Sequence, residues 1–411
     1  MIIEGKTKKV YDIPAEPGNC LVVSKDRITA FNSDRSNELE GKAEISTRTM
    51  EYVYKYLDFC GVKTHLVRGN TKISMICKKC AMIPIEWVTR RVATGSFLRR
   101  NPGVPEGYKF SPPKVEYFLK DDANNDPQWS YEQVISAHLK CGDRVLKPED
   151  VDVLTRTTRV IFEVLELAWG SLDCQLVDMK IEFGVDITTG ELILADVIDS
   201  DSWRLWPGGD KRMMKDKQVY RDMALVTQEG LDTVKRNFLW VAERLSQLTS
   251  CKALGQVAII AGSPSDADFC AKIIRALKEF GIASQQRYTS AHKSTEEALS
   301  VLAEYEGCSE PTVIIAVAGR SNGLGPVMSG NSCLPVINCP PIGDSVFAPL
   351  DIWSSMRLPS GLGCPTVISP EAAALAAAQI LAQQSHVVWS RLRVRQLLTA
   401  CNIRYADAQS H

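Results

Sequence analysis

Hydrophobic and polar residues alternate from Val177 to Phe183, in the order Val-Asp-Met-Lys-Ile-Glu-Phe. Successive side chains of a β-strand point to opposite faces, so this pattern predicts a strand with one apolar and one charged face. Asp178, Lys180 and Glu182 share the charged face. By itself the segment is more typical of a half-buried strand with a solvated outer face.

The residues that follow this strand predict a hairpin. Residues 186–190 (Asp-Ile-Thr-Thr-Gly) are typical of a turn, and a second apolar run comes after them. The hairpin would return Asp196 beside Glu182, so that two carboxylates could surround one divalent cation. Lys180 and Arg204 would then be available for anions. The sequence therefore predicts a site for a magnesium-bound nucleotide, in which carboxylates and phosphate oxygens share the metal.

Strand-like and helical patterns are distributed differently in the two halves of the chain. Residues 1–248 combine short strand-like runs with separate helical stretches, which predicts an α+β domain. Its helical stretches lie at 45–59, 149–169 and 229–248. From residue 256 to 411 strands and helices alternate, which predicts a doubly wound α/β domain with a parallel sheet. The short polar segment 249–255 is interpreted as a linker.

The second half can be divided further from its pattern. Strands are expected at 257–261, 284–288, 312–317 and 335–339, and helices at 267–280 and 295–305. A further helix begins after Ser369, because a serine N-cap followed by proline is typical of a helix start.

Composition excludes several classes of function. The chain has 411 residues, with 48 Lys and Arg against 49 Asp and Glu and a net charge of -1. This balance argues against nucleic-acid or acidic-membrane partners, and no apolar stretch approaches the roughly 20 residues of a membrane span. Thirteen cysteines spread singly along the chain favour reduced thiols and a cytoplasmic location.

The segment 5–11 (Gly-Lys-Thr-Lys-Lys-Val-Tyr) places three lysines between strand-like stretches. Neither common glycine-rich phosphate motif occurs there. A glycine-hinged turn carrying Lys6 and Lys8 can still cover the phosphates of a nucleotide. A solvated lysine cluster is the other interpretation, and this segment alone does not decide between them.

Each predicted strand of the second half ends in a small polar loop, where doubly wound folds bind ligands. The loop 262–266 holds two serines and an aspartate before a helix, whose N-terminus can bind a phosphate; an ordinary N-cap explains it as well. His292 and Lys293 follow the next strand. The glycines of 318–326 allow a ligand to approach the backbone closely.

Two longer segments of the first half, 83–96 and 176–184, resemble the signature sequences of phosphoribosylaminoimidazole-succinocarboxamide (SAICAR) synthetases. The resemblance extends from Glu4 to about Leu248. These enzymes join the carboxylate of carboxyaminoimidazole ribonucleotide (CAIR) to the amine of aspartate, and convert ATP to ADP and phosphate. The resemblance therefore implies ATP as a substrate with Mg²⁺, held by Glu182 and Asp196.

The same resemblance implies roles for other residues. Lys6 and Lys8 would contact the phosphates of ATP, while Asp178 and Lys180 would lie at the reacting centre. The residues implied to contact CAIR or aspartate are Arg90, Ser96, Asp201, Arg204, Lys217 and Arg221. These residue types suit the chemistry, because guanidinium groups bind phosphate and carboxylate with two hydrogen bonds, and phosphoryl transfer depends on positioning and charge neutralisation.

The loops of the second half, together with residues 353–359, resemble aminoimidazole ribonucleotide (AIR) carboxylase and its relative, CAIR mutase. The resemblance implies a flavodoxin-like three-layer fold and carboxylation of AIR by CO₂ without ATP, biotin or metal. His292 would be the general base, and Lys293 and Ser321 would stabilise the new carboxylate. The residues implied to bind the ribose phosphate and the ring are Ser263, Ser265, Asp266, Arg320 and Asn322.

The order synthetase then carboxylase resembles the bifunctional purine enzyme of animals, which implies a homo-oligomer, an octamer built around the carboxylase domains. In one alternative the second domain is a CAIR mutase; mutases carry arginine after the loop histidine, and this chain has Lys293. In others the second domain only senses nucleotides or oligomerises, or the chain is a scaffold without catalysis. The intact His292 and Ser321, and the intact charged residues of the first half, argue against both.

Overall fold

The computed structural model describes residues 1–31, 34–249, 254–343 and 346–410. The chain forms two compact units, the first of residues 1–250 with 393–411 and the second of residues 251–392. Residues 393–411 were predicted as part of the second domain, whereas residues 393–410 pack with the first unit. Of the predicted linker 249–255, residues 250–253 lie outside the described part of the chain.

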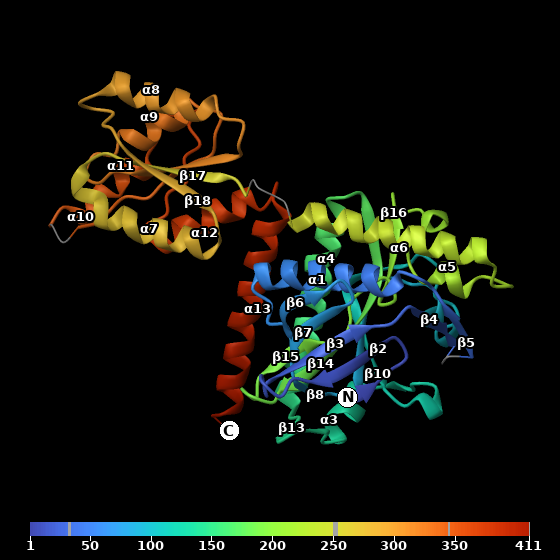
Figure 1. The fold of residues 1–411 in the computed structure, drawn as a ribbon. Coiled ribbons are helices and arrows are strands. Elements are labelled where there is room, and N and C mark those ends of the chain that lie inside the picture. Colours follow the sequence, from blue (N-terminus) through green and yellow to red (C-terminus); the bar gives the residue numbers. More distant parts are fainter. Residues whose placement is uncertain (32–33, 250–253, 344–345, 411) are drawn as a thin grey trace. The chain divides into compact units, whose positions relative to one another are not determined.

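The first unit is built on two large antiparallel sheets (Figure 1). The five-stranded sheet has the order β1 (Ile3–Glu4), β2 (Lys8–Asp12), β3 (Asn19–Ser24), β7 (Ser74–Lys78) and β6 (Leu66–Thr71). The seven-stranded sheet has the order β11 (Gln128–Trp129), β10 (Lys109–Leu119), β9 (Ile85–Val92), β14 (Cys174–Asp186) and β15 (Leu192–Ala195), with β8 (Cys80–Met82) and β16 (Trp203–Pro207) also paired to β14. The remaining strand pairs are β4 (Arg27–Ala30) with β5 (Arg35–Glu38) and β12 (Lys140–Cys141) with β13 (Arg144–Val145).

The helices of this unit agree with the predicted helical stretches. The long ones are α1 (Lys42–Cys60), α4 (Pro148–Gly170) and α6 (Gln228–Thr249), and the short ones are α2 (Ser96–Arg100), α3 (Tyr131–Ser136) and α5 (Gln218–Arg221). Helices α1 and α6 pack together, and α4 packs on β14. The prediction of an α+β domain is confirmed. Within the described residues no helix combines the length and apolar character needed to cross a membrane.

Strand β14 is buried on both faces. The apolar residues Val177, Met179 and Ile181 are buried, as predicted, but Asp178 and Glu182 are also only 4% and 1% exposed. A solvated outer face is therefore excluded for this strand. Strand pairing covers only the edges of β14. Helix α4 packs against this strand, and the charged side chains Asp178 and Glu182 are covered by the cations paired with them, which are Arg90, Arg204, Lys120 and Lys180.

The last helix, α13 (His386–Ala408), contributes its second half to the first unit. Arg393 Nε lies 2.8 Å from Glu163 Oε2, and Arg404 Nε lies 2.9 Å from Asp152 Oδ2. The hydroxyl of Tyr405 donates to Asp150 Oδ1 at 3.1 Å. All three acceptors belong to α4, so the C-terminal segment supports the helix that packs on β14.

The second unit is a parallel four-stranded sheet in the order β18 (Ala283–Tyr288), β17 (Gln256–Ala261), β19 (Thr312–Val317) and β20 (Val336–Asn338). Its helices are α7 (Ala267–Glu279), α8 (Thr295–Glu306), α9 (Leu324–Gly330), α10 (Ala348–Asp351), α11 (Trp353–Met356) and α12 (Pro370–Leu381). Figure 1 shows α7 and α12 on one side of the strands and α8 and α9 on the other.

Alternate residues of the strands fill two separate cores. Val313, Ile315 and Val317 pack with residues of α7 and α12, whereas Ile314 and Ala316 pack with residues of α8 and α9. A parallel strand covered by helices on both faces requires this pattern. The predicted doubly wound, three-layer architecture is confirmed, and so is the N-cap of α12, where Ser369 accepts from the backbone N–H of Ala372.

His65 should make the first unit less stable at acid pH. Its side chain is buried beside Tyr54, with ring centroids 5.0 Å apart, and its Nε2 has no hydrogen-bond partner among the described residues. Burial lowers the pKa of His65 to about 3, with a smaller contribution from Lys8. Below the ordinary histidine pKa of about 6.5 the unfolded chain binds a proton that the folded chain does not, so stability falls by about 1.4 kcal/mol per pH unit until the folded pKa is reached.

The His65→Phe variant should lose this acid dependence between roughly pH 6.5 and 4, as measured by calorimetry of the first unit's unfolding transition. The exposed His138, replaced by asparagine, is the matched control. An acid slope that is the same in wild type and in His65→Phe would show that His65 does not cause it.

Candidate functional site

The charged residues predicted on β14 lie on one face of the seven-stranded sheet, together with residues from neighbouring strands. Cross-strand partners share a face of a sheet. Asp178 pairs in register with Arg90 of β9 and with Arg204 of β16, and Lys180 pairs with Val88. Side chains from sequence-distant strands therefore converge where β14 is most buried.

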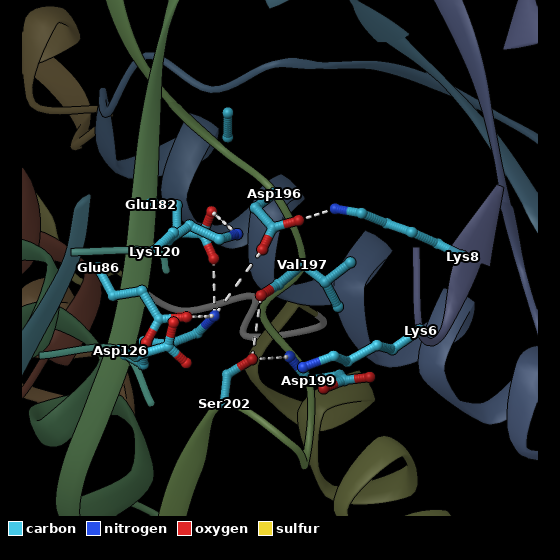
Figure 2. Close-up of polar contacts among 12 residues, drawn as sticks. Lys6, Lys8, Glu86, Lys120, Asp126, Glu182, Asp196, Val197, Asp199 and Ser202 are labelled. Carbon is cyan, nitrogen blue, oxygen red and sulfur yellow. Dashed lines mark hydrogen bonds and ion pairs between the residues drawn. The ribbon is translucent and has the colours of Figure 1, made fainter. Parts of the chain in front are cut away.

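Glu182 and Lys180 form the centre of an alternating array of charges (Figure 2). Lys180 Nζ lies 2.7 Å from Glu182 Oε1, 2.8 Å from Glu86 Oε1 and 4.0 Å from Asp196 Oδ2. Lys120 Nζ lies 2.7 Å from the other oxygen of Glu182. The ammonium of Lys8 is paired with the other oxygen of Asp196, Oδ1. We call these six residues the lysine–carboxylate array.

The charged state of the array follows from its neighbours. Burial alone would raise the pKa of Glu182, but the positive charges of Lys180 and Lys120 outweigh it and lower the pKa to about 2. Burial lowers the pKa of Lys8 to about 8, in spite of the attraction of Glu182. For Lys180, Glu182 and Glu86 outweigh burial and raise the pKa. The carboxylate of Glu182 and the ammonium of Lys180 are therefore charged at neutral pH.

The array is compatible with a divalent cation. The predicted hairpin is confirmed: Glu182 pairs with Ala195, the last residue of β15, and Asp196 follows directly. The carboxylates of Glu182 and Asp196 are hard oxygen donors that both face a positive charge. Among the described residues no three His, Cys, Asp or Glu side chains form a metal cluster, so ligand oxygens or water would have to complete the shell, as is usual for Mg²⁺ beside phosphates.

Asp178 is the residue next to Lys180 on the charged face of β14. It lies between two arginines. Arg90 Nη1 donates to Asp178 Oδ2 at 2.8 Å, and Arg204 Nη1 donates to the same oxygen. Arg90 is also paired with the buried Glu116. Gly95 has φ +59, and a Cβ placed on it would lie 2.7 Å from Arg204 Nη2. Only glycine therefore allows the guanidinium of Arg204 to lie against this turn.

A pocket beside this turn is lined by Thr94, Gly95, Arg204, Trp206, Lys211, Met214, Gln218 and Asp222. Ser96, the first residue of α2, follows Gly95 directly and is partly exposed. Arg221 is partly buried near Arg204, and burial and that positive charge lower its pKa. The guanidinium of Arg204 lines the pocket and thus lies where an anion can reach it.

Asp201 forms a second cluster with lysines. Its Oδ2 lies 3.1 Å from Lys42 Nζ and 3.5 Å from Lys217 Nζ. Burial would raise the pKa of Asp201, but Lys42 and Lys217 lower it to about 2. Asp201 therefore carries a negative charge in a buried position.

The structure brings most of the residues predicted for the first half together, with one exception. Lys6 does not join the array: its Nζ lies 2.8 Å from Asp122 Oδ1, and both side chains are exposed. The sequence analysis did not identify Glu86, Lys120 or Lys42. Glu86 lies in the segment 83–96, which carried the resemblance and was the available signal; Lys42 and Lys120 lie outside the two signature segments.

In the second unit the polar loops meet at the carboxyl ends of the strands. The parallel strands β17 and β19 are neighbours, with β18 on the outer side of β17. The chain therefore reverses its direction of winding between β17 and β19, which is where open α/β sheets bind ligands. Gly262 lies against Ala318, since a Cβ on it would be 3.4 Å from the Cβ of Ala318.

His292 lies against the loop after β19. A Cβ placed on Gly323 would be 2.7 Å from His292 Nε2, so the imidazole and this glycine are in direct contact. Lys293 is exposed, and its backbone N–H donates to Ser290 Oγ. Ser321 and Arg320 are exposed in the same loop as Gly323, and Arg320 has φ +55.

The loop after β17 presents hydroxyl groups at the start of α7. The Oγ atoms of Ser263 and Ser265 are 2.8 Å apart, and Ser263 also accepts from the backbone N–H of Ser265. Asp266 follows, and burial raises its pKa. These groups can receive an anion together with the helix N-terminus.

The side chain of Asn322 is buried and forms its hydrogen bonds within the protein. Its Nδ2 donates to Asn338 Oδ1 at 3.0 Å and to Ser355 Oγ at 2.9 Å, and its Oδ1 accepts from the backbone N–H of Gly325 at 3.1 Å. Ser354 Oγ accepts from the backbone N–H of Asn322. The buried Asn322–Asn338–Ser355 network therefore fixes the loop that carries Ser321. The sequence analysis gave no role to Asn338, Ser354 or Ser355.

Comparison with known families agrees with the two-part organisation. Residues 1–237 match the SAICAR synthetase family, and residues 256–400 match the AIR carboxylase family. The solved structure "SAICAR synthetase (Type-2) in complex with ADP" has 28% sequence identity and a TM-score of 0.53, and the match covers 60% of this chain and 98% of that chain.

Whole-chain relatives contain both parts. "Multifunctional protein ADE2" of Gallus gallus is 56% identical over 404 residues, which cover 98% of this chain and 95% of the relative. The "Bifunctional phosphoribosylaminoimidazole carboxylase/phosphoribosylaminoimidazole succinocarboxamide synthetase" of Homo sapiens is 55% identical over 406 residues, which cover 99% of this chain and 95% of the relative. With this identity and coverage, the chain belongs to the family of bifunctional phosphoribosylaminoimidazole carboxylase/succinocarboxamide synthetases.

Proposed function

We propose that this chain catalyses two consecutive reactions. The second unit carboxylates AIR with CO₂ to give CAIR, and the first unit ligates CAIR to L-aspartate with ATP to give SAICAR, ADP and phosphate. The observation that carries the proposal is that bifunctional relatives align over almost the whole chain, so that both halves are accounted for together. The lysine–carboxylate array and the loops around His292 support one reaction each.

In the synthetase reaction the array acts on ATP. Lys8, Lys120 and Lys180 neutralise phosphate charge. Glu182 and Asp196 would hold Mg²⁺, which would supply further charge neutralisation. A carboxylate is a poor acyl donor until it is phosphorylated, so the CAIR carboxylate must lie beside the γ-phosphate. We place it near Asp178 and Lys180, with Arg90, Arg204, Ser96, Lys217, Arg221 and Asp201 contacting CAIR or aspartate. Lys6 closes over the phosphates only after leaving Asp122.

In the carboxylase reaction the electron-rich C4 of AIR attacks CO₂. His292 then removes the remaining C4 proton as general base, and Lys293 and Ser321 stabilise the new carboxylate. Ser263, Ser265, Asp266 and Arg320 bind the ribose phosphate and the ring. Asn322 positions the loop, because its hydrogen bonds are directed inward.

Gly325→Ala should abolish carboxylation. A Cβ on Gly325 would overlap Oδ1 of Asn338, which is fully buried and hydrogen-bonded to Asn322. The methyl group must displace the network that holds the loop of Ser321, so the rate should fall by about 10²-fold or more even where the domain stays folded. Gly363→Ala is the matched control, since a Cβ there meets no atom within 4 Å and its φ is not in the positive range that strains other residues. Equal loss in both variants would contradict the role of the network.

The two-step proposal is tested with the purified full-length chain. AIR and CO₂ from bicarbonate are added first, and CAIR formation is followed without nucleotide. Aspartate and Mg-ATP are then added, and SAICAR and ADP are measured. CAIR formation without SAICAR, or ligation of supplied CAIR without carboxylation, would limit the function to one half of the chain.

We also propose a cytoplasmic homo-oligomer, an octamer built around the second units. Every cysteine of the described part of the chain is a free thiol, which suits a reducing compartment. The segment around α10 and α11 exposes large apolar side chains, including Phe347, Leu350 and Trp353 at 68%, 62% and 51%. Exposed apolar groups of this kind favour association between subunits.

A further inference from the structure

Lys42 is a buried cation without a role in the reaction described above. It is the first residue of α1, after Gly41, and its side chain is only 2% exposed. Its Nζ lies 3.1 Å from Asp201 Oδ2 and 3.5 Å from Ser46 Oγ. A lysine so deeply buried must be paired, and one partner here is a residue of the proposed substrate site.

The surroundings keep this lysine charged. Burial would lower the pKa of Lys42, but Asp201 and Asp199, with a smaller contribution from Asp26, outweigh it and raise the pKa. The Nζ of Lys42 is occupied by Asp201 and Ser46, so we do not expect Lys42 to touch a substrate itself. Any effect on the reaction must pass through its partners.

One carboxylate oxygen of Asp201 is paired with lysines, and the other accepts no hydrogen bond from the described residues. Its Oδ2 is shared by Lys42 and Lys217 at 3.1 and 3.5 Å. Its Oδ1 is inaccessible to solvent and has no hydrogen-bond partner among the described residues. The backbone is fixed as well, since the N–H of Asp201 donates to Asp199 Oδ1 at 2.8 Å. A buried carboxylate oxygen without a donor is unfavourable, and a bound ligand can supply the missing N–H.

We propose that Lys42 is a positioning residue, which holds the carboxylate of Asp201 so that its free oxygen accepts an N–H of a synthetase substrate. This inference rests on the proposed contact between Asp201 and CAIR or aspartate. Both substrates carry an amine, and the one bound by Asp201 is identified by the KM that changes. Lys42 acts on the reaction only through Asp201.

A double-mutant cycle in the full-length protein tests this dependence. Lys42→Met and Asp201→Asn should each lower kcat/KM of ligation by about 10- to 100-fold, because each removes or misdirects the same acceptor. The double variant should be no worse than Asp201→Asn alone. Lys235→Met is the matched control, and this variant should leave ligation unchanged. Lys235 belongs to α6 and lies beside Gly41, the residue before α1.

The pH profile separates positioning from a general structural role. The groups facing Asp201 are Lys42, Lys217, Arg221 and Asp199. Without Lys42, the repulsion of Asp199 is less balanced and the pKa of Asp201 rises. The Lys42→Met variant should therefore lose ligation further as the pH falls, whereas Lys42→Arg, which keeps the charge, should restore the wild-type profile in part.

The outcomes separate the inference from the proposed function. Wild-type ligation by Asp201→Asn would overturn the substrate contact and the inference with it. Loss in Asp201→Asn with full ligation by Lys42→Met would overturn the inference alone, and so would losses that multiply in the double variant. Calorimetry of the first unit's unfolding transition monitors whether that unit is folded in each variant. If Lys42→Met does not fold, the double variant removes both charges, and a loss beyond that of Asp201→Asn again overturns the inference.

Discussion

Glu182→Gln is expected to abolish ATP-dependent ligation and to leave carboxylation of AIR unchanged. The Glu182 carboxylate is 1% exposed and bridges Lys180 and Lys120, each at 2.7 Å. The amide would leave two ammonium groups without their buried counter-charge and would remove one proposed Mg²⁺ ligand. Losses of roughly 10²-fold or more are ordinary when such a contact to a phosphoryl group is removed.

The experiment measures SAICAR and ADP from supplied CAIR, aspartate and Mg-ATP, with carboxylation as the internal reference. Asp196→Asn should show the same selective loss. Glu191→Gln is the matched control on the same hairpin, because Glu191 is exposed and pairs only with Lys63. Full ligase activity in both Glu182→Gln and Asp196→Asn would place the metal elsewhere.

His292→Asn is expected to stop CAIR formation and to leave ligation of supplied CAIR intact. When C4 of AIR attacks CO₂, the tetrahedral carbon must lose its proton before the ring becomes aromatic again. Loss of a general base typically costs about 10²- to 10⁴-fold. Glu297→Gln, an exposed residue near the start of α8, should behave as wild type. Normal carboxylation by His292→Asn would assign the proton transfer to another group.

An isotope experiment on the wild-type enzyme tests the accompanying expectation for Lys293. Labelled CO₂ should enter CAIR directly in the absence of nucleotide. Rapid conversion of the N-carboxylated isomer of AIR, without incorporation of label from CO₂, would instead make this half of the chain a mutase.

The local sequence pattern was sufficient to predict the secondary structure and part of the site in the first unit. The period of two from Val177 to Phe183 and the turn at 186–190 determine a hairpin, and the hairpin alone brings Asp196 next to Glu182. The same pattern could not tell whether the charged face of β14 is solvated. That depends on the side chains that cover this face, and two of them, Arg90 of β9 and Lys120 after β10, come from segments distant in the sequence.

Tertiary pairing also decided which side chains complete the sites. Lys120 and Glu86 reach the array because β10, β9 and β14 are neighbours, and the segment of Lys120 has no motif of its own. Asn322 lies in a ligand-binding loop, yet its amide is directed inward by Asn338 and Ser355. The sequence pattern of a loop does not predict where its side chains point, because that direction depends on partners supplied by other strands and helices.

The sequence by itself determined two domain types, their order, the residues that carry charge and, through resemblance, the family. These depend on local periodicity, turn residues and long matching segments. The tertiary structure alone decided that the carboxylates of β14 are buried and paired, that Lys42 forms an ion pair with Asp201, and that Arg393, Arg404 and Tyr405 contact α4 of the first unit. Each of these depends on long-range packing: a buried charge is stable only where distant elements supply its partner, and one segment of chain does not specify which elements will meet.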